Sequence, residues 1–394
     1  MTSPTPLSGL RVLEFTHMIM GPSAGMILAD LGAAVTKVEP APKGDTTRYL
    51  TGSGVGFYAA FGRGRRSLCV DMKQPEGRAL VRRLAEQADV LIENFRPGAM
   101  AKLGLGYAEL AAVNPRLVYA SLKGFLPGPY EHRTALDEVV QMMGGLAYMT
   151  GPEGRPLRAG SSAIDIMGGL SAVVGILSAI RERETTGLGG EVQAGLFESV
   201  ALLMAQHMAQ TRITGIAPPP MSVRLPAWPV YDIFDTADGG QVFVGVVTDT
   251  SWPMFCRAFG LDDLAADPTL ATKQQRVEQR HRTIPRVAAA LAAYTKPELM
   301  AKCEALGLPF APIGKPADLF DDVHLNGSGG LVPMTLPDGR DVKLPALPIS
   351  LDGVRPGGAG DLRAPGADSG AIAAELGYSE AEVAALMAAG TISG

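Results

Sequence analysis

A single carboxylate stands in the most apolar part of the chain. Asp165 has no charged neighbour from Ala159 to Ile180; small residues precede it, and the pair Gly168 and Gly169 follows it. An isolated carboxylate at the entrance of a helix can be an N-cap, because aspartate is a preferred N-cap residue. It can also be a nucleophile that forms a covalent acyl intermediate. The local pattern leaves both interpretations open.

The sequence after Asp165 predicts the helix that holds it. An apolar run extends from Leu170 to Ile180, with Ala, Gly and Ser spaced so that another backbone can pack closely. Four charged residues and then Gly187 end it, as glycine commonly does after a helix. The run is shorter than the roughly 18 residues of a membrane-spanning helix. We therefore expect a buried helix and no membrane partner.

The stretch around Asp165 resembles the signature region of the class III CoA-transferases, the family of formyl-CoA transferase and carnitine CoA-transferase. There a G-x-x-x-x-D-x-x-x-G stretch, an apolar helix and an R-x-x-T-G-x-G-x-x-V turn follow one another. The matching residues are Gly160, Asp165, Gly169, Arg183, Thr186, Gly187, Gly189 and Val192. By this resemblance Asp165 is the nucleophile, which carries the acyl group and then CoA.

The first 125 residues alternate between predicted strands and helices. The predicted strands are 10–15, 34–39, 67–72, 89–94 and 117–122, and the predicted helices are 22–31, 77–87 and 107–113. Such alternation implies right-handed crossovers. We therefore expect an α/β fold with an open, Rossmann-like parallel sheet. The loop Gly21-x-x-x-Gly25 lacks the G-x-G-x-x-G pattern, and bulky residues at 18–20 would obstruct a pyrophosphate, so no nicotinamide cofactor is expected.

The resemblance to class III CoA-transferases covers roughly the first 200 residues almost continuously. It is carried by L-x-G-x-x-V-L-E-F-T-x-x-x-x-G-P at 7–22, L-G-A-x-V-x-K-V-E-P at 31–40, G-D at 44–45, R-x-S-L-x-V-D-M-K at 65–73, A-D-V-L-I-E-N-F-R-P-G at 88–98 and N-P-R-L-V-Y-A-S-L-K-G-F at 114–125. By matching position, the residues expected to contact CoA are His17, Val70, Lys73, Asn94, Phe95, Arg96 and Lys102.

These residue types suit CoA, but each has an ordinary alternative. Lys and Arg bind phosphates, yet charged side chains are usually solvated surface groups. Asn94 could equally cap a turn. His17 follows a predicted strand, where a core or capping histidine is common.

A second stretch, 134–145, matches the family segment R-P-x-Y/F-D-x-x-x-Q-A-x-x-G. The resemblance adds Asp137 to the expected CoA contacts, with Gln141 and Gly144 or Gly145 at the other matching positions. Leu136 stands where an aromatic residue is common, and Ile19 stands where formyl-CoA transferase has a glutamine. The glycine-run loop of that enzyme is not visible in residues 215–260. These departures argue against oxalate and formyl-CoA as substrates.

The expected chemistry is a covalent relay. Asp165 would form an acyl-aspartate anhydride with the donor acid and then an aspartyl-CoA thioester. Each step develops an oxyanion, which requires nearby backbone N–H donors. The candidates for exposing such donors are Gly144, Gly145, Gly168 and Gly169.

The rest of the chain predicts a second domain and a returning tail. Residues 1–205 are expected to form the first part of a large CoA-binding α/β domain, and residues 220–325 a smaller α+β domain that opens with a hairpin. Residues 335–394 would return to the large domain. The resemblance implies two interlocked subunits, so a homodimer is expected.

Composition narrows the function further. The chain has 394 residues and a net charge of −5, which argues against a nucleic-acid partner. Its three cysteines are widely spaced, which argues against a disulfide framework or a cysteine zinc site. With no visible signal peptide, a cytoplasmic protein is expected. Coenzyme A enters only as a substrate, with no permanent cofactor and no metal.

The sequence therefore predicts a CoA-transferase that moves CoA from an acyl-CoA, by family habit succinyl-CoA, to a small carboxylic or dicarboxylic acid. Arg224 could hold the distal carboxylate of that acid, because a guanidinium matches a carboxylate, although a solvated surface arginine is the commoner case. A 2-methylacyl-CoA racemase of the same fold is the alternative. Its family has a histidine directly before the aspartate at 137, whereas here Leu136 stands there and His132 lies five positions upstream of Asp137. A non-enzymatic CoA-binding regulator is a further alternative.

Overall fold

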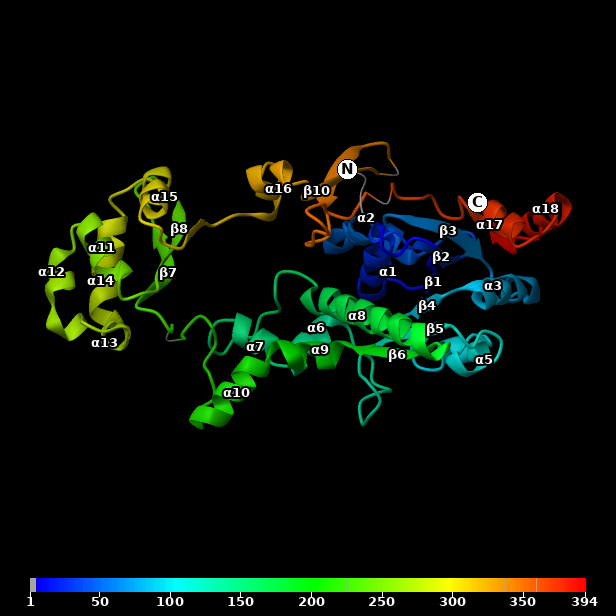
Figure 1. Ribbon diagram of the computed structural model, residues 1–394, viewed down its shortest axis with the longest axis horizontal. Coiled ribbons are helices and arrows are strands. Elements are labelled where there is room, and N and C mark those ends of the chain that lie inside the picture. Colours follow the sequence, from blue (N-terminus) through cyan, green and yellow to red (C-terminus); the bar gives the residue numbers. More distant parts are fainter. Residues whose placement is uncertain (1–4, 225, 337, 359) are drawn as a thin grey trace. The chain divides into compact units, whose positions relative to one another are not determined.

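A computed structural model describes residues 5–224, 226–336, 338–358 and 360–394. They form two compact units (Figure 1). Unit 1 comprises the chain up to Ser222 together with Val323–Gly394, and unit 2 is Val223–Asp322.

Unit 1 is built on a seven-stranded sheet in the order β12-β3-β2-β1-β4-β5-β6. Its strands are β1 (Arg11–Phe15), β2 (Ala34–Pro40), β3 (Arg65–Val70), β4 (Val90–Glu93), β5 (Val118–Lys123), β6 (Gly190–Gly195) and β12 (Ile392–Ser393). Neighbours are parallel except β12, which pairs antiparallel with β3. The order 3-2-1-4-5-6 is that of the doubly wound Rossmann sheet. The predicted mostly parallel α/β sheet is thus confirmed.

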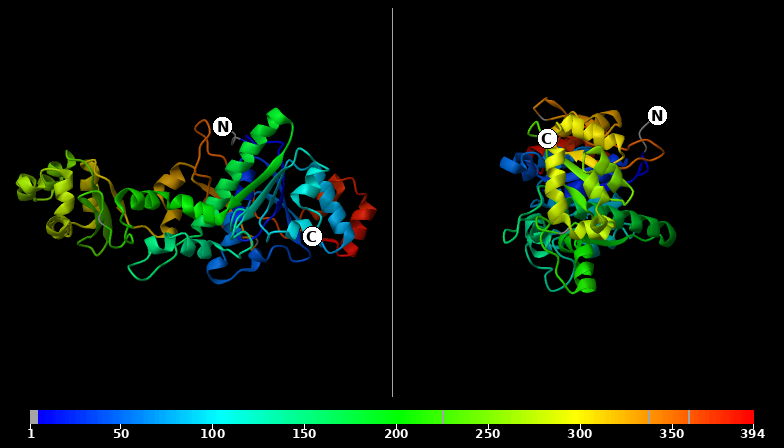
Figure 2. Two further views of the ribbon diagram at one scale, coloured as in Figure 1. Left: turned by 90° about the horizontal axis from the view of Figure 1, so that it is seen from below. Right: turned by 90° about the vertical axis from the view of Figure 1, so that its left-hand side faces the viewer.

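Successive strand residues face two separate cores, which explains why the strands are apolar almost throughout. Val12, Val90 and Val118 pack under α1 (Met20–Asp30) and α8 (Ala163–Thr186). Their neighbours Leu13, Leu91 and Tyr119 face the opposite core. That core is closed by α3 (Pro75–Gln87), α5 (Tyr107–Ala111), α17 (Ser369–Glu375) and α18 (Glu380–Ala388). The tail therefore ends against the sheet, with the C-terminus beside α17 (Figure 1 and Figure 2).

The connections of unit 1 carry short elements. They are η1 (Thr46–Tyr49), η2 (Gly52–Gly54), α2 (Phe57–Phe61), α4 (Ala99–Lys102), α6 (Asp137–Met143), α7 (Leu146–Thr150), α9 (Leu196–Leu203), α10 (Ala205–Thr214), α16 (Val323–Gly327), β10 (Leu331–Thr335) and β11 (Asp341–Pro345). Strands β10 and β11 pair antiparallel.

Helices α1 and α8 pack closely because α8 has glycines where it meets α1. A Cβ on Gly168 would lie 2.6 Å from Met20 Cε, and a Cβ on Gly169 would overlap Ser23 Oγ. Helix α1 follows β1 and α8 precedes β6, so both run antiparallel to the strands. Their N-termini consequently meet at the carboxyl edge of the sheet.

Helix α8 corrects the prediction in length and burial. It has 24 residues and ends at Gly187, whose φ is 77° and whose amide binds the Arg183 carbonyl, as glycine at a helix end predicts. It is long and apolar enough to cross a membrane, and only 33 % of its most apolar window is buried. Leu170 and Val174 are 46 % and 65 % exposed. The expectation of a short, buried helix was therefore wrong.

Unit 2 is an α+β unit. Its antiparallel sheet has the order β7-β8-β9, formed by Val230–Asp235, Gln241–Val246 and Phe310–Pro312. Its helices are α11 (Ser251–Ala258), α12 (Asp262–Ala266), η3 (Pro268–Leu270), α13 (Lys273–Glu278), α14 (Arg280–Leu291), α15 (Lys296–Ala305) and η4 (Pro316–Phe320). Its core packs Val242 and Val244 of β8 against Phe255, Val287 and Leu299 of three helices.

Charged side chains lie buried between the sheet and α1. Glu14 of β1 is opposite Lys37 of β2, and the Lys37 Nζ lies 3.5 Å from its Oε1. Arg65 Nε lies 2.7 Å from Glu14 Oε2. The side chains of all three are at most 2 % exposed. Gly25 of α1 leaves room for the carboxylate, because a Cβ there would overlap Glu14 Oε2.

We predict that Gly25→Ala lowers the free energy of unfolding of unit 1 by about 1–3 kcal/mol, the usual cost of overpacking a core. Gly56→Ala is the control, because a Cβ at Gly56 meets nothing within 4 Å. Thermal melts followed by circular dichroism measure both variants. Equal melting temperatures for the two would show that the Glu14 pocket does not require glycine.

Candidate functional site

The strand order of unit 1 reverses between β1 and β4, where ligands bind in sheets of this kind, beyond the carboxyl ends of the strands. A cavity of about 820 Å³ opens there. It is lined by the last residues of β2 and β5, by residues that follow β1, β2, β4 and β5, and by the loop before α6. They are Thr16, His17, Val38, Pro40, Asp45, Thr46, Asn94, Phe95, Arg96, Pro97, Ala99, Leu122, Lys123, Gly124, Glu131, His132, Arg133, Thr134, Ala135 and Leu136.

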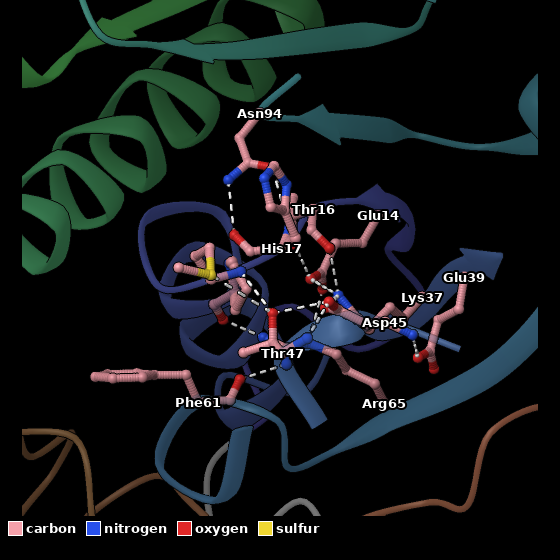
Figure 3. Close-up of polar contacts among 12 residues, drawn as sticks. Glu14, Thr16, His17, Lys37, Glu39, Asp45, Thr47, Phe61, Arg65 and Asn94 are labelled. Carbon is pink, nitrogen blue, oxygen red and sulfur yellow. Dashed lines mark hydrogen bonds and ion pairs between the residues drawn. The ribbon is translucent and has the colours of Figure 1, made fainter. Parts of the chain in front are cut away.

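Asn94 ties the loop after β4 to the loop after β1. Its Oδ1 accepts from the His17 amide and lies 3.1 Å from His17 Nδ1, and its Nδ2 donates to the His17 carbonyl at 2.8 Å. Figure 3 shows the two side chains facing each other. The His17 ring stacks on Phe95, with 5.7 Å between ring centroids. The side chain of Asn94 is therefore used to fix this wall of the cavity.

The buried charged residues Lys37 and Asp45 also hold the loop after β1 in place (Figure 3). Lys37 Nζ donates to the Thr16 carbonyl at 2.5 Å and lies 3.0 Å from Asp45 Oδ2. Asp45 accepts from Thr47 Oγ1, which in turn accepts from the amide of Met18. Met18 has a φ of 64°, which is uncommon outside glycine. These contacts hold the Thr16–Met18 backbone in a shape that its sequence does not favour.

A second cavity of about 340 Å³ shares Val38, Pro40 and Phe95 with the first. Val70 and Lys73 line the second cavity, and His17, Asn94, Phe95 and Arg96 line the first. Six predicted CoA contacts therefore lie in two cavities with a common wall. The charges of Lys73 and Arg96 are exposed to solvent. Lys102 is exposed on α4 but does not line either cavity.

Asp165 is the third residue of α8, not its N-cap; Ser162 occupies the cap position. It lies on the same face as Gly168 and Gly169, since residues three and four apart are neighbours on a helix. Those glycines contact the first turn of α1, which begins three residues after His17. Asp165 is therefore at the carboxyl edge of the sheet, on the side of the cavity loop. The interpretation of Asp165 as a cap is wrong.

Ser162 makes no side-chain hydrogen bond to α8; the side chain that accepts from its first amides is Asp137 of α6. Its Oδ2 accepts from the amides of Ile164 at 2.9 Å and Asp165 at 3.0 Å. Its Oδ1 accepts from Gln141 Nε2 and lies 3.5 Å from Arg158. Asp137 is 6 % exposed and does not line the cavities described above. Both its oxygens are used within the protein, and its contact with CoA stays a prediction.

The carboxyl group of Asp165 is half-buried and strongly perturbed. Burial raises its pKa, to about 7, and the nearby charge of Asp137 adds to the rise, whereas Arg158 opposes it. Among the hydrogen bonds of the described residues, none involves the Asp165 carboxylate. The group thus combines an unbonded oxygen pair with a proton affinity far above that of ordinary aspartate.

The four glycines predicted as oxyanion donors fall into two classes. Gly168 and Gly169 lie inside α8, where amides are committed to helical hydrogen bonds, and their role is close packing on α1. The Gly144 amide binds the Val140 carbonyl. Gly145 has a φ of 88°, and its amide has no partner among the described residues. Gly145 is the one of the four whose donor is available.

Arg224 lies in unit 2, where it is exposed and close enough to Arg280 for their charges to interact. Asp165 belongs to unit 1. Within the described ranges, His, Cys, Asp and Glu form no group of three suited to a metal ion.

The sequence did not single out Lys123. It ends β5 and lines the cavity, and its Nζ lies 2.5 Å from Glu93 Oε1 and donates to the Phe95 carbonyl at 2.6 Å. Its place at the carboxyl end of a parallel strand was a usable signal, because those ends meet at one edge. The cavity-lining residues 131–133 had no comparable signal, because they precede the stretch 134–145 that matches the family segment.

Comparison with known proteins fits this arrangement. Residues 7–367 match the family described as CoA-transferase family III. The chain belongs to this family. The predicted family is thereby confirmed, and the protein is a CoA-transferase.

Two relatives and one solved structure show how similar the chain is to known proteins. It is 33 % identical to the succinyl-CoA–D-citramalate CoA-transferase of Chloroflexus aurantiacus, over 86 % of each chain. It is 34 % identical to the succinate–glutarate CoA-transferase of Agrobacterium fabrum, over 87 % of this chain and 89 % of the relative. A crystal structure of a CAIB/BAIF family protein from Brucella suis matches with a TM-score of 0.84 and 33 % identity, covering 95 % of this chain and all of that one.

We predict that kcat/KM for the acyl-CoA rises with pH through a midpoint near pH 7 and levels off above about pH 8. If Asp165 is the nucleophile that the resemblance implies, its attacking form is the carboxylate, and its pKa of about 7 in the free enzyme sets the midpoint. Initial rates at saturating acid and limiting acyl-CoA, from pH 5 to 9, test this. A flat profile down to pH 5 would contradict the raised pKa.

We also predict that Asp165→Asn stabilises the protein increasingly as pH rises. The folded-state pKa is raised above the unfolded value of about 3.9. Wild-type stability from this group is therefore complete below about pH 4 and is lost as pH rises toward 7. The melting temperature of the variant relative to wild type should climb over that range and then stay constant. A difference independent of pH would exclude Asp165 as the titrating group.

Proposed function

We propose that this CoA-transferase moves CoA from succinyl-CoA to a small dicarboxylic acid through a covalent relay at Asp165. The observation that supports the relay is the half-buried Asp165 carboxylate at the start of α8, which has no hydrogen bond among the described residues. The substrate class is supported by the relatives named above, whose names pair succinyl-CoA or succinate with D-citramalate or glutarate. A further relative, from Haloarcula hispanica, is a succinyl-CoA:mesaconate CoA-transferase with 33 % identity over 91 % of this chain.

The two cavities that share Phe95 have residues suited to the adenine and to the phosphates of CoA. The apolar residues Val38, Pro40 and Val70 provide a slot for the adenine. Lys73 and Arg96 lie at the solvent side, where they can pair with phosphates. Binding CoA by parts remote from the thioester supplies energy that orients the reacting carbonyl. His17, fixed by Asn94, forms a wall of this groove.

The relay has four steps in which bonds balance. An Asp165 oxygen attacks the succinyl carbonyl carbon; a C–O bond forms, the C–S bond breaks and CoA thiolate leaves. The thiolate attacks the Asp165 Cγ of the anhydride and displaces succinate, which departs with an oxygen from Asp165. The acceptor carboxylate attacks the aspartyl-CoA thioester and displaces the thiolate. The thiolate then attacks the acceptor acyl carbon, which yields the new acyl-CoA and regenerates Asp165.

Each step places negative charge on a carbonyl oxygen, which backbone N–H groups stabilise. Gly145 is the proposed donor, since its amide has no partner among the described residues. Arg224 stays a prediction for the distal carboxylate of the acid.

We further propose a homodimer in the cytoplasm. Large apolar side chains are exposed on α8, α9 and α10, and apolar surfaces of this extent mark protein contacts in soluble proteins. They include Leu170, Val174, Leu202, Leu203, Met208 and Ile213, the last 85 % exposed. A second subunit would cover them, which would also account for the low burial of α8.

The racemase alternative has no specific support. The position before Asp137 is held by Leu136, which cannot transfer a proton. His132 lies on an exposed loop and pairs with Glu131.

We predict that purified protein exchanges CoA between succinyl-CoA and dicarboxylic acids of four or five carbons, and much less with acetate or formate. Asp165→Asn should lower kcat by at least about 10³-fold, as removal of a covalent nucleophile does. Liquid chromatography with mass spectrometry measures each acyl-CoA. Glu184→Gln is the control, since Glu184 lies on the same helix but is exposed and paired with Arg181.

Hydroxylamine provides an independent readout, because it captures an acyl-aspartate as a hydroxamate. It should inactivate the enzyme only when succinyl-CoA is present, and peptide mapping should find the hydroxamate at Asp165. Undiminished exchange by Asp165→Asn would refute the relay. Exchange that depends on Asp165 but uses other acids would refute only the substrate assignment.

A further inference from the structure

The N-terminus of α8 is occupied by a side chain from another element. Asp137 opens α6 and reaches the amides of Ile164 and Asp165 across 27 and 28 positions of sequence. It is itself held by Gln141, whose Oε1 accepts from the Ala159 amide at 2.8 Å. The segment that leads into α8 is thus bound at both ends by α6.

This contact decides what the Asp165 side chain can do. A carboxylate in the first turn of a helix normally accepts from the free amides there, and these bonds and the helix dipole favour its charged form. Here Asp137 takes the amides of Ile164 and Asp165. The Asp165 carboxylate is therefore left without a hydrogen bond among the described residues. An unbonded carboxylate has its lone pairs available for attack on a carbonyl.

We propose that Asp137 is a positioning residue for the transfer reaction: it holds the Asp165 backbone and withdraws the helix amides from the nucleophile. The inference rests on the proposed function, in which Asp165 attacks the thioester. It gives Asp137 a role that acts through Asp165, and it assigns no contact between Asp137 and CoA.

The electrostatic surroundings make Asp137 the decisive neighbour. On α6, Asp137 faces Asp165, and Glu138 turns toward Arg158, 3.9 Å away. The other elements packed on α8 present charged groups that serve elsewhere. Asp30 of α1 pairs with Arg63, Lys123 of β5 pairs with Glu93, Glu198 of α9 accepts from the Leu126 amide, and Glu191 of β6 is exposed. Burial raises the Asp165 pKa most; among the charged groups of the described residues, Asp137 raises it further and Arg158 lowers it.

Asp137→Asn tests the proposal, since asparagine keeps an oxygen for the two amides and removes the charge. The full-length protein is labelled with aspartate carrying ¹³C at the carboxyl carbon, and the Asp165 signal is identified by its loss in Asp165→Asn. Titration by NMR measures the Asp165 pKa without reference to activity. We expect Asp137→Asn to lower it by about one pH unit or more, the usual effect of removing a like charge.

The kinetic prediction is specific to a positioning role. The midpoint of kcat/KM against pH should move down with the NMR value. Asp137→Ala, which frees the amides to bind Asp165, should lower kcat at least about tenfold with an unchanged KM for succinyl-CoA. Glu184→Gln, at the other end of α8 where Glu184 is exposed and paired with Arg181, should leave the pH midpoint, kcat and KM unchanged.

If the Asp137 variants do not fold, Arg158→Gln provides a second test, because it leaves Asp137 as the acceptor for the Ile164 and Asp165 amides. Arg158 lowers the Asp165 pKa, so its removal should raise that pKa and shift the activity profile to higher pH. If the variants only lower the melting temperature, with the Asp165 pKa and kcat unchanged, Asp137 is a structural cap and the proposal is overturned. Failure of the relay itself would appear separately, as exchange retained by Asp165→Asn.

Discussion

The contact between the first turns of α1 and α8 is the constraint on which the site depends. Gly168 and Gly169 let α8 approach Met20 and Ser23 more closely than any other residue type would allow. Because both helices run antiparallel to the strands, this contact brings two N-termini to one edge of the sheet. One follows the loop that walls the cavity, and the other carries Asp165. Asp165 and the loop that walls the cavity thus belong to one packed layer.

Buried carboxylates occur at two places near the site, and they are neutralised to different degrees. Beneath the cavity loop, Glu14 and Asp45 are balanced by Lys37 and Arg65, and buried charges of this kind require partners. At the start of α8 the two carboxylates are only partly neutralised. Asp137 and Asp165 share one arginine, Arg158, which is partly exposed. The first arrangement makes the loop rigid. The second leaves the Asp165 carboxylate destabilised as an anion, the form that the proposed relay requires for attack.

Sequence patterns predicted the sheet and the location of Asp165, because strand alternation and the family motifs are local. The family resemblance named His17, Asn94 and Phe95 as expected CoA contacts, and the structure brings them together in one cavity because loops after parallel strands share an edge. Sequence patterns did not predict the cap by Asp137, which depends on a contact 28 positions away that only the tertiary structure reveals. The low burial of α8 was missed because an apolar run looks the same whether it faces its own core or another surface.

The most direct test of the account follows oxygen atoms. In the relay, each turnover transfers one oxygen from the acceptor carboxylate to Asp165 and one from Asp165 to the departing succinate. With the acceptor dicarboxylate labelled by ¹⁸O in its carboxylates, steady turnover should release succinate that carries one ¹⁸O per molecule, as measured by mass spectrometry. If succinate released in unlabelled water carries no ¹⁸O while CoA transfer proceeds, Asp165 is not the carrier and the covalent relay is wrong.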